Sequence, residues 1–320
     1  MDSPITIVIP VYNRAHIVRR TLDSVARQTL APAHIVIVDN NSTDTSLSTV
    51  RDWASGRHNV TVLSESTPGA CAARNCGLRA VSSEWTMFFD SDDVMSPRHV
   101  EEFTRAIEEH PGADVIGRDV YLRSLDGSRR RLYFRGGDSP MFHHLFRGCL
   151  SSQRFIARTR LFREAGGWNE SLPGWDDFEL GVRVLLKNPR ILTLGGEPSV
   201  TVMQQEQSLT GLTFTGHPER WERSLDTIHT LFASLPHSDT RTKYLRWLDA
   251  RAMILAAQYE SESRAAAASD PDFSRRAHTL STAMRGRVLA RTDAPGRMKM
   301  IYLHNLRLHR LTWLVARAIL

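Results

Sequence analysis

The chain has 320 residues, of which 41% are hydrophobic and 24% are charged, proportions typical of a folded, water-soluble protein. This length is enough to bury a complete α/β core and to leave about a hundred residues for an appendage. The three cysteines are too few for a disulfide framework, and no Cys/His spacing typical of zinc sites occurs. No apolar run reaches the roughly 18 residues of a membrane span, and the segment 5–11 is too short for a signal-peptide core. Composition therefore predicts a cytoplasmic protein.

The net charge of +6 is concentrated at the C-terminal end. Residues 283–320 contain eight Arg or Lys and one acid, Asp293, so this tail carries +7 and the rest of the chain −1. A weakly acidic body argues against nucleic-acid binding. The tail has two interpretations: residues 298–320 form an interfacial helix on the anionic inner face of the cytoplasmic membrane, or they pack against the preceding domain or a second subunit of a homodimer.

The first 90 residues alternate short β-branched runs with amphipathic runs. The pattern predicts strands at 5–9, 35–38, 60–63 and 85–89, with helices at 15–28, after the capping residues 41–44, and at 70–81. A strand every 25–30 residues with helices between is typical of a parallel sheet, and such sheets bind ligands at the carboxyl ends of their strands. We therefore expect segments 10–13, 39–41 and 90–93 to lie on one rim.

The pattern beyond residue 97 is more mixed. A helix to about residue 109 is followed by a predicted hairpin with strands at 113–122 and 131–134 and a turn at Asp126-Gly127. Further helices are predicted near 142–147, 161–165 and 177–187, and short strands near 191–194 and 200–203. From about Pro218 the pattern is helical, with a break at Asp270-Pro271.

Asp90, Asp92 and Asp93 directly follow an apolar strand. Three carboxylates in four residues repel one another unless a cation neutralises them, and oxygen-rich sites suit Mg²⁺ or Mn²⁺ with phosphate oxygens as further ligands. The alternative is a solvated helix cap before Pro97.

Two other acidic sites, one a single residue and one a pair, each have two possible roles. Asp39 ends a strand, where it either accepts hydrogen bonds from a base or ribose hydroxyl or caps the next helix. Asp176 and Asp177 open a helix between Trp175 and Phe178. They either stabilise the helix N-terminus or supply a general base in a partly apolar setting.

Six segments together resemble glycosyltransferase family 2, in the family's order and over about residues 4–210. The segments are 8–14, 38–44, 68–75, 89–93, 166–170 and 175–180. The resemblance implies a GT-A fold, which is an α/β architecture with a Rossmann-like, mostly parallel nucleotide-binding sheet. It implies a catalytic domain at 1–215, with a nucleotide-binding half at about 1–95 and an acceptor half at 96–215. A helical region at 216–320 would follow.

The resemblance also implies an inverting transfer of a sugar from a nucleotide diphosphate sugar, by default a UDP-sugar, to an acceptor hydroxyl. The expected context is bacterial cell-surface polysaccharide, lipooligosaccharide or glycoconjugate synthesis. Asp177 would be the catalytic base beside Asp176, and Asp92 with Asp90 would hold Mn²⁺ or Mg²⁺. The implied nucleotide-sugar contacts are Pro10, Val11, Tyr12, Asn13, Asp39, Asn41, Arg74, Asp90 and Ser91.

One position departs from the family pattern. Many members have a histidine that contacts metal or diphosphate, whereas here Gln205 and Glu206 stand nearest that position. These two residues are expected to replace the histidine or to act as a lid. Elsewhere, His143 and His144 are expected at the surface, and the run 128–131 is either a solvated turn or a contact for a phosphorylated acceptor.

Two other functions fit the sequence less well. A sugar nucleotidylyltransferase would need a Gly-rich loop with Arg and Lys after the first strand, where Pro10–Asn13 stand instead. A non-catalytic assembly module predicts loss of the acidic sites, whereas Asp39, Asp92 and Asp177 are all present. The sequence therefore favours an active transferase.

Overall fold

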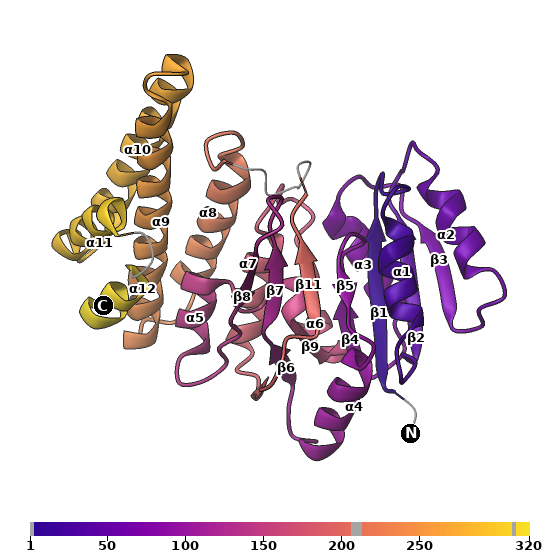
Figure 1. The fold of residues 1–320 in the computed structure, drawn as a ribbon. Coiled ribbons are helices and arrows are strands. Elements are labelled where there is room, and N and C mark those ends of the chain that lie inside the picture. Colours follow the sequence, from indigo (N-terminus) through magenta and orange to yellow (C-terminus); the bar gives the residue numbers. More distant parts are fainter. Residues whose placement is uncertain (1–2, 206–212, 309–311) are drawn as a thin grey trace. The chain divides into compact units, whose positions relative to one another are not determined.

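The computed structural model describes residues 3–205, 213–308 and 312–320 and forms two compact units (Figure 1). The first unit comprises residues up to 144 together with 148–171 and 176–205, and the second comprises 145–147, 172–175 and the chain from 206 onward. The boundary predicted between residues 215 and 216 remains a prediction.

A seven-stranded sheet forms the core of the first unit, in the order β10-β6-β9-β4-β1-β2-β3. The β-branched run Ile5–Val11 makes β1, whose side chains are almost all buried, as expected for a central parallel strand. Its neighbours β2 and β4 run parallel to it, and β3 runs parallel to β2. The remaining strands are β2 (His34–Asp39), β3 (Val60–Ser64), β4 (Trp85–Phe88), β6 (Val115–Arg118), β9 (Phe155–Arg158) and β10 (Ile191–Leu194).

Strand β9 is antiparallel to both of its neighbours, β4 and β6. The sequence pattern did not predict this strand, because four residues at 155–158 show too little periodicity to distinguish a strand from a loop. The sheet is therefore mostly parallel, with one reversed strand in its interior.

A second sheet contains four strands in the order β5-β11-β7-β8. They are β5 (Val94–Met95), β7 (Val120–Arg123), β8 (Arg129–Leu132) and β11 (Val200–Met203). The single strand predicted at 113–122 is wrong, because β6 and β7 belong to different sheets. The chain changes sheet at Asp119, whose carboxylate accepts hydrogen bonds from the Phe134 N–H (2.6 Å) and from Arg131 Nε (2.7 Å). The predicted hairpin is confirmed for β7 and β8.

Helices flank the sheets of the first unit. They are α1 (Val18–Ala26), α2 (Ser46–Ala54), α3 (Ala70–Ala80), α4 (His99–Glu109), α6 (Thr159–Glu164) and α7 (Asp176–Leu186), and α5 (Pro140–Arg147) crosses into the second unit. Helix α3 packs against β1 and β2. Gly77 makes this approach possible, because a Cβ there would overlap the side chain of Val8 and lie 3.3 Å from Val38.

We expect Gly77→Ala to lower the free energy of unfolding by about 1–3 kcal/mol, since the added methyl group overpacks the helix–sheet contact. Gly286→Ala is the matched control, because Gly286 is also helical but a Cβ there would meet nothing within 4 Å. The control should stabilise the protein by about 0.5–1 kcal/mol through helix propensity alone. Urea denaturation of both variants measures the difference, and equal effects would show that α3 does not need a glycine for packing.

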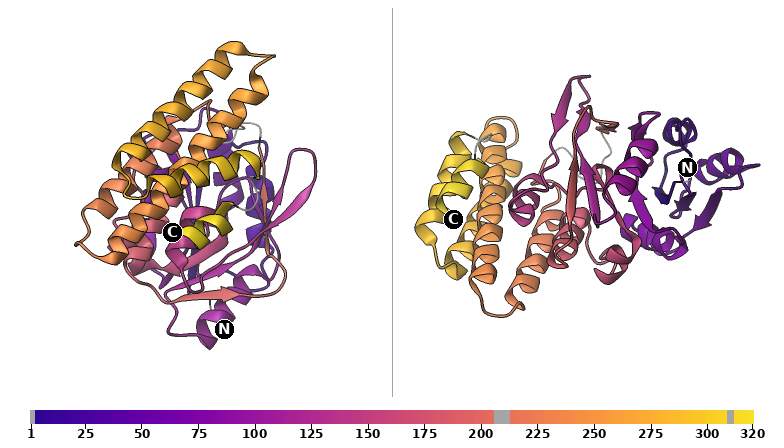
Figure 2. Two further views of the ribbon diagram at one scale, coloured as in Figure 1. Left: turned by 90° about the vertical axis from the view of Figure 1, so that its left-hand side faces the viewer. Right: turned by 90° about the horizontal axis from the view of Figure 1, so that it is seen from below.

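The second unit is helical. It contains α8 (Glu219–Ala233), α9 (Asp239–Ala266), α10 (Pro271–Arg291), α11 (Pro295–Arg307) and α12 (Thr312–Ile319). The long helices α9 and α10 lie side by side, as both views of Figure 2 show. The predicted break is confirmed: Asp270 accepts a hydrogen bond from the Phe273 N–H (2.9 Å), and Pro271 takes the first helical position.

Candidate active site

The carboxyl ends of β1, β2 and β4 lie side by side on one rim of the large sheet. Val11 pairs with Asp39 in the parallel register, and the Phe89 N–H donates to the Val8 carbonyl at 2.9 Å. The predicted placement of segments 10–13, 39–41 and 90–93 on one rim is therefore confirmed.

Two asparagines shape the loops after β1 and β2. Asn13 and Asn41 have φ angles of 49° and 60°, and asparagine tolerates this left-handed region better than most residues. The Asn13 side-chain oxygen accepts from the Thr43 N–H at 2.8 Å, and the Asn13 N–H donates to the Ser42 hydroxyl at 3.1 Å. Asn41 Nδ2 donates to the Ser66 carbonyl at 2.9 Å. Each loop is thus fixed by its neighbour.

Pro10, Val11 and Tyr12 differ in exposure. Tyr12 exposes 56% of its surface at the end of β1, whereas Pro10 is partly buried. The Val11 side chain is buried in the hydrophobic core, and its carbonyl accepts from the Asn40 N–H at 2.8 Å. Of these three residues, Tyr12 presents the largest free side-chain surface to a ligand.

Asp39 is buried, with only 3% of its surface exposed. One carboxylate oxygen accepts from the Ser42 N–H at 3.3 Å, and the other, Oδ1, has no partner among the described residues. A buried acceptor without a donor is costly, because its lost hydration is not replaced. The site is therefore suited to a donor from a ligand, such as a base N–H or a ribose hydroxyl.

The carboxylates that follow β4 are only partly neutralised. Asp92 lies 3.7 Å from Arg14, and Asp93 Oδ1 accepts from the Met203 N–H at 2.8 Å. Burial, followed by repulsion from Asp90, raises the pKa of Asp92 to about 6, and the same two causes raise the pKa of Asp93. The Ser91 carbonyl accepts from the Thr21 hydroxyl at 2.9 Å, which holds this turn against α1. Because the negative charge of these carboxylates is only partly neutralised, the turn favours an added cation.

Arg74 joins the carboxylate turn to the start of α7. Its buried guanidinium donates to Asp90 at 2.9 Å and to Asp176 at 2.7 Å, and it lies over the Trp168 ring at 4.4 Å from the centroid. Asp90 also accepts a hydrogen bond from Gln153. Two acidic segments that are about 85 positions apart in the sequence therefore meet on one arginine.

Asp177 lies beside this pair and has an altered protonation equilibrium. Burial, followed by the negative charge of Asp176, raises the pKa of Asp177 to about 7, and the positive charge of Arg74 opposes that rise. Arg154 is also buried within electrostatic range of Asp177. A carboxyl group with a pKa near neutrality is suited to accept a proton from a hydroxyl group.

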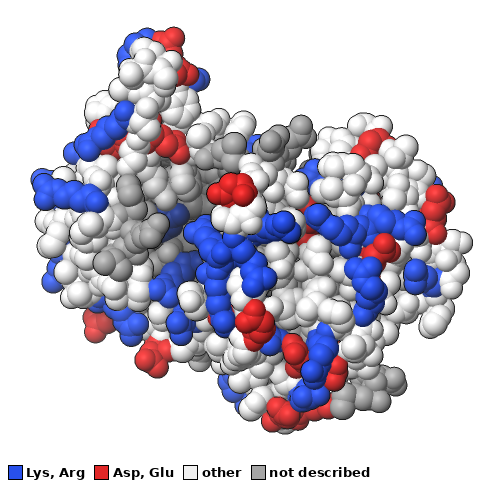
Figure 3. Space-filling model, viewed as in Figure 1, with Lys and Arg blue, Asp and Glu red and all other residues white. Residues whose placement is uncertain are grey.

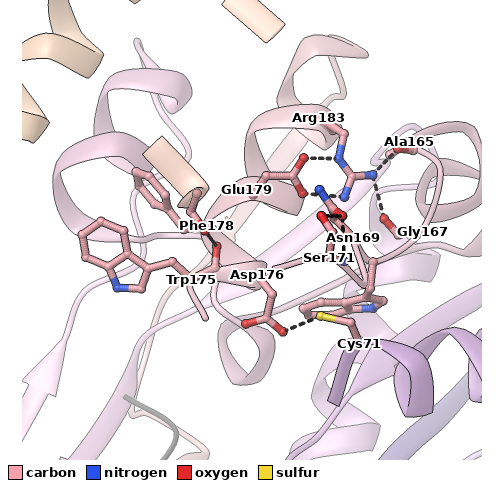
Figure 4. Close-up of polar contacts among 12 residues, drawn as sticks. Cys71, Ala165, Gly167, Asn169, Ser171, Trp175, Asp176, Phe178, Glu179 and Arg183 are labelled. Carbon is pink, nitrogen blue, oxygen red and sulfur yellow. Dashed lines mark hydrogen bonds and ion pairs between the residues drawn. The ribbon is translucent and has the colours of Figure 1, made fainter. Parts of the chain in front are cut away.

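The start of α7 is held by a set of local contacts. Figure 4 shows Asp176 beside Cys71, whose thiol donates to the carboxylate at 3.2 Å. Glu179 accepts twice from Arg183, which also donates to the carbonyls of Ala165 and Gly167. Burial raises the pKa of Cys71, so it is a packed thiol. These contacts fix the acidic pair to the 165–171 loop.

The carboxylate turn fits a metal ion held jointly with a ligand. Among the described residues no group of three or more His, Cys, Asp or Glu converges as a complete metal site. Mg²⁺ and related ions are commonly bound by one or two carboxylates together with substrate phosphates. The raised pKa of Asp92 and the unpartnered Oδ2 of Asp93 show that the negative charge of this turn is not fully compensated, which fits such a partial site.

Some residues that the sequence analysis singled out have no described contact with the acidic residues around Arg74. Gln205 is partly buried, and Glu206 lies outside the described residues. The expectation of surface histidines is wrong: His143 and His144 are 8% and 1% exposed. His144 bonds the Phe178 carbonyl at 2.8 Å and accepts from the Leu150 N–H at 3.1 Å, so it supports α7 from the core.

Three residues of the site, Gln153, Arg154 and Trp168, were not among the predicted site residues. Trp168 lay within a segment that resembled the family, and only this signal pointed to it. Gln153 and Arg154 lie in a short 3₁₀ turn without a pattern, and only the tertiary fold brings them to Asp90 and Asp177.

Comparison with known proteins identifies the class. The family model described as glycosyl transferase family 2 matches residues 6–165, which is half of the chain. This chain therefore belongs to glycosyl transferase family 2. It is 34% identical over 134 residues to glycosyltransferase GlyA of Streptococcus pneumoniae, a match that covers 42% of this chain but only 19% of that relative.

Solved structures agree on the fold. S. aureus TarS 1–349 in complex with UDP-GlcNAc superposes with a TM-score of 0.66 at 20% identity, over 99% of this chain and 91% of that one. The mannosyltransferase PcManGT from Pyrobaculum calidifontis, in complex with GDP-Man and Mn²⁺, gives 0.53 at 17% identity, over 99% and 87%. The predicted GT-A fold, with a helical region after it, is confirmed.

Proposed function

We propose that this protein is an inverting glycosyltransferase that moves a hexosyl group from a nucleotide diphosphate sugar to an acceptor hydroxyl. The observation that carries the proposal is the Arg74 bridge, which brings the Asp90 side of the nucleotide rim to the Asp176–Asp177 pair. This bridge puts the proposed donor-binding rim and the carboxyl group of Asp177, whose pKa is about 7, in one site.

The proposed reaction is a single displacement. The acceptor oxygen attacks the anomeric carbon of the donor as its proton passes to the carboxylate of Asp177. The bond between that carbon and the diphosphate oxygen breaks, and the nucleoside diphosphate leaves with the bonding electrons. Attack opposite the leaving group inverts the configuration at the anomeric carbon. Arg74 holds Asp176 beside the base and Asp90 beside the diphosphate.

The donor assignment rests on the rim and on two structural neighbours. TarS binds UDP-GlcNAc, and PcManGT binds GDP-Man with Mn²⁺. We propose a UDP-sugar donor here, with Asp39, Asn41 and Tyr12 toward the nucleoside. Asp92 and Asp90 would hold Mn²⁺ or Mg²⁺, and such an ion would stabilise charge on the departing diphosphate.

The biosynthetic setting is part of the same proposal. We propose a role in bacterial cell-surface polysaccharide, lipooligosaccharide or glycoconjugate synthesis, at the inner face of the cytoplasmic membrane. Membrane contact would run through the basic tail, and the homodimer remains a prediction. The helices in the described part of the chain include none that is long and apolar enough to cross a bilayer.

We expect UDP with Mn²⁺ to raise the melting temperature of the protein. At a ligand concentration 100 times the dissociation constant, the folded state gains about 2.7 kcal/mol. Asp92→Asn should remove the part of the gain that depends on Mn²⁺, whereas the exposed Asp52→Asn on α2 should keep it. Thermal denaturation with UDP, GDP and dTDP, each with and without Mn²⁺, measures these effects. If no nucleotide stabilises the wild-type protein, the transferase proposal fails.

A further inference from the structure

The hairpin formed by β7 and β8 is strongly basic. Residues 120–135 contain five arginines and one acid, Asp126, for a net charge of +4. Figure 3 shows Lys and Arg side chains gathered over the area where these strands lie in Figure 1. Outside the tail the chain is close to neutral overall, so the positive charge of the hairpin is concentrated locally.

The strand register sorts these arginines onto two faces. Arg123 pairs with Arg129 and Tyr121 pairs with Arg131, so these four side chains share one face. Arg130 pairs with Leu122 on the opposite face. Because β8 is the edge strand of its sheet, one side of this row is not covered by another strand.

Aromatic rings hold several of these guanidinium groups in place. Arg129 lies over the Tyr121 ring at 3.6 Å from the centroid, and Arg135 lies over the Tyr133 ring at 5.4 Å. A guanidinium group stacked on a ring keeps its N–H edge available for bidentate bonds to an oxyanion. The arrangement is therefore organised before a ligand binds.

Nearby carboxylates neutralise only part of the charge. Asp119 pairs with Arg131 at 2.7 Å, and Glu197 lies 3.9 Å from Arg129 and accepts from the Tyr121 hydroxyl. Asp126 bonds within its own turn, to Ser128. Among the described residues no carboxylate forms an ion pair with Arg123, Arg130 or Arg135, which are all exposed. The hairpin thus keeps an excess of positive charge.

The hairpin lies close to the candidate active site. Strand β5 begins directly after Asp93, and the sheet order β5-β11-β7-β8 puts the hairpin two and three strands away. At a strand spacing of about 4.8 Å, this corresponds to about 10–14 Å. Arg130 also acts electrostatically on Arg154, which is in turn within range of Asp177. An acceptor bound beside this carboxylate turn therefore needs only a few bonded units to reach the arginines.

We propose that the β7–β8 hairpin binds phosphate groups of the acceptor, so that the preferred acceptor is a phosphodiester-bearing glycan or polyol chain. This inference rests on the proposed function, because it assigns the acceptor of the same site. Arg129 and Arg131 are two residues apart on one face, about 7 Å along the strand. That row suits successive phosphates of an extended chain better than a single anion.

The observations favour such an acceptor over a lipid surface. An interfacial element presents several large apolar side chains to the bilayer. The hairpin exposes two, Leu125 and Tyr133, each by 49%. The Tyr133 ring has guanidinium groups of Arg131 and Arg135 over it. Polar contacts thus occupy the face that a membrane-binding hairpin would leave apolar.

The test compares two triple variants with the wild-type protein. The hairpin variant is Arg123→Gln, Arg129→Gln and Arg135→Gln, which removes exposed arginines from the face that carries the stacked guanidinium groups. The control is Arg19→Gln, Arg98→Gln and Arg105→Gln, three exposed arginines elsewhere in the same unit. The probes are a fluorescent synthetic hexamer of glycerol phosphate, uncharged maltohexaose, and vesicles containing 30% anionic lipid. Anisotropy and co-sedimentation are measured over a series of salt concentrations. Circular dichroism checks folding.

We expect the hairpin variant to bind the glycerol phosphate hexamer about tenfold or more weakly, with a shallower salt dependence, since three charge contacts are lost. The control should match the wild type. Equal binding of the hexamer by the hairpin variant and the wild type would overturn the inference, as would a loss confined to vesicles. Stabilisation by UDP is measured in parallel, and its absence in the wild type would refute the transferase proposal. Binding of the hexamer tests the hairpin proposal independently of that result.

Discussion

Asp177→Asn is expected to lower kcat by about 10²–10⁴-fold, because asparagine occupies the same space but cannot accept the proton of the acceptor hydroxyl. Stabilisation by UDP and Mn²⁺ should stay as in the wild type, since the nucleotide rim is built from other segments. Initial rates at saturating donor and acceptor, together with thermal denaturation, separate the two effects. Full turnover by the variant would exclude Asp177 as the base.

The pH dependence of kcat gives a second measurement of the same role. A general base works when it is deprotonated, so kcat should fall as the pH drops through the pKa of Asp177, which is about 7. Asp176→Asn removes a negative charge that raises this pKa, so the fall should move to lower pH. An acid-side fall that does not move in this variant would assign the titration to another group.

Arg74→Gln is expected to destabilise the protein by about 3–5 kcal/mol, the usual cost of removing one partner from a buried ion pair. The substitution leaves Asp90 and Asp176 without their shared cation and removes the guanidinium group from the Trp168 ring. Arg74→Lys should recover part of the loss, since lysine keeps the charge but not the planar fork that spans both carboxylates. Transfer activity should fall in both variants.

Arg79→Gln is the matched control for Arg74, because Arg79 lies on the same helix. Its ion pair with Glu65, at 3.2 Å, is on the surface, and its side chain is 65% exposed. Such a pair contributes about 1 kcal/mol or less. Urea denaturation measures all three variants. A cost for Arg74→Gln no larger than that for Arg79→Gln would show that the bridge does not hold the two acidic segments together.

The parts of the fold that the sequence predicted are those with strong local signals. The run Ile5–Ile9 is β-branched and ends near a proline, and the strands at 35–38, 60–63 and 85–89 follow at regular spacing. This pattern predicts a parallel sheet with a ligand-binding rim. Asp39 could be identified because it ends one of these strands, and Asp92 because it lies in the acidic run that follows another.

The parts that escaped prediction depend on contacts between distant segments. The run 113–122 is apolar enough to suggest one strand, and only the hydrogen bonds of Asp119 to residues 131 and 134 show where it changes sheet. The resemblance implied Arg74 as a nucleotide-sugar contact, which remains a prediction, and no local pattern indicated its ion pairs with Asp90 and Asp176. A pattern within one segment holds no information about such pairings.

The reversed strand β9 has a consequence for biosynthesis. It lies between β4 and β6 in the interior of the sheet, yet residues 155–158 are made long after β1, β2, β3 and β4. While the ribosome adds the intervening residues, the apolar strand Trp85–Phe88 has one unpaired edge. Unpaired apolar edges are the sites where partly folded chains associate. We therefore expect the nascent chain to be prone to association between the synthesis of β4 and that of β9.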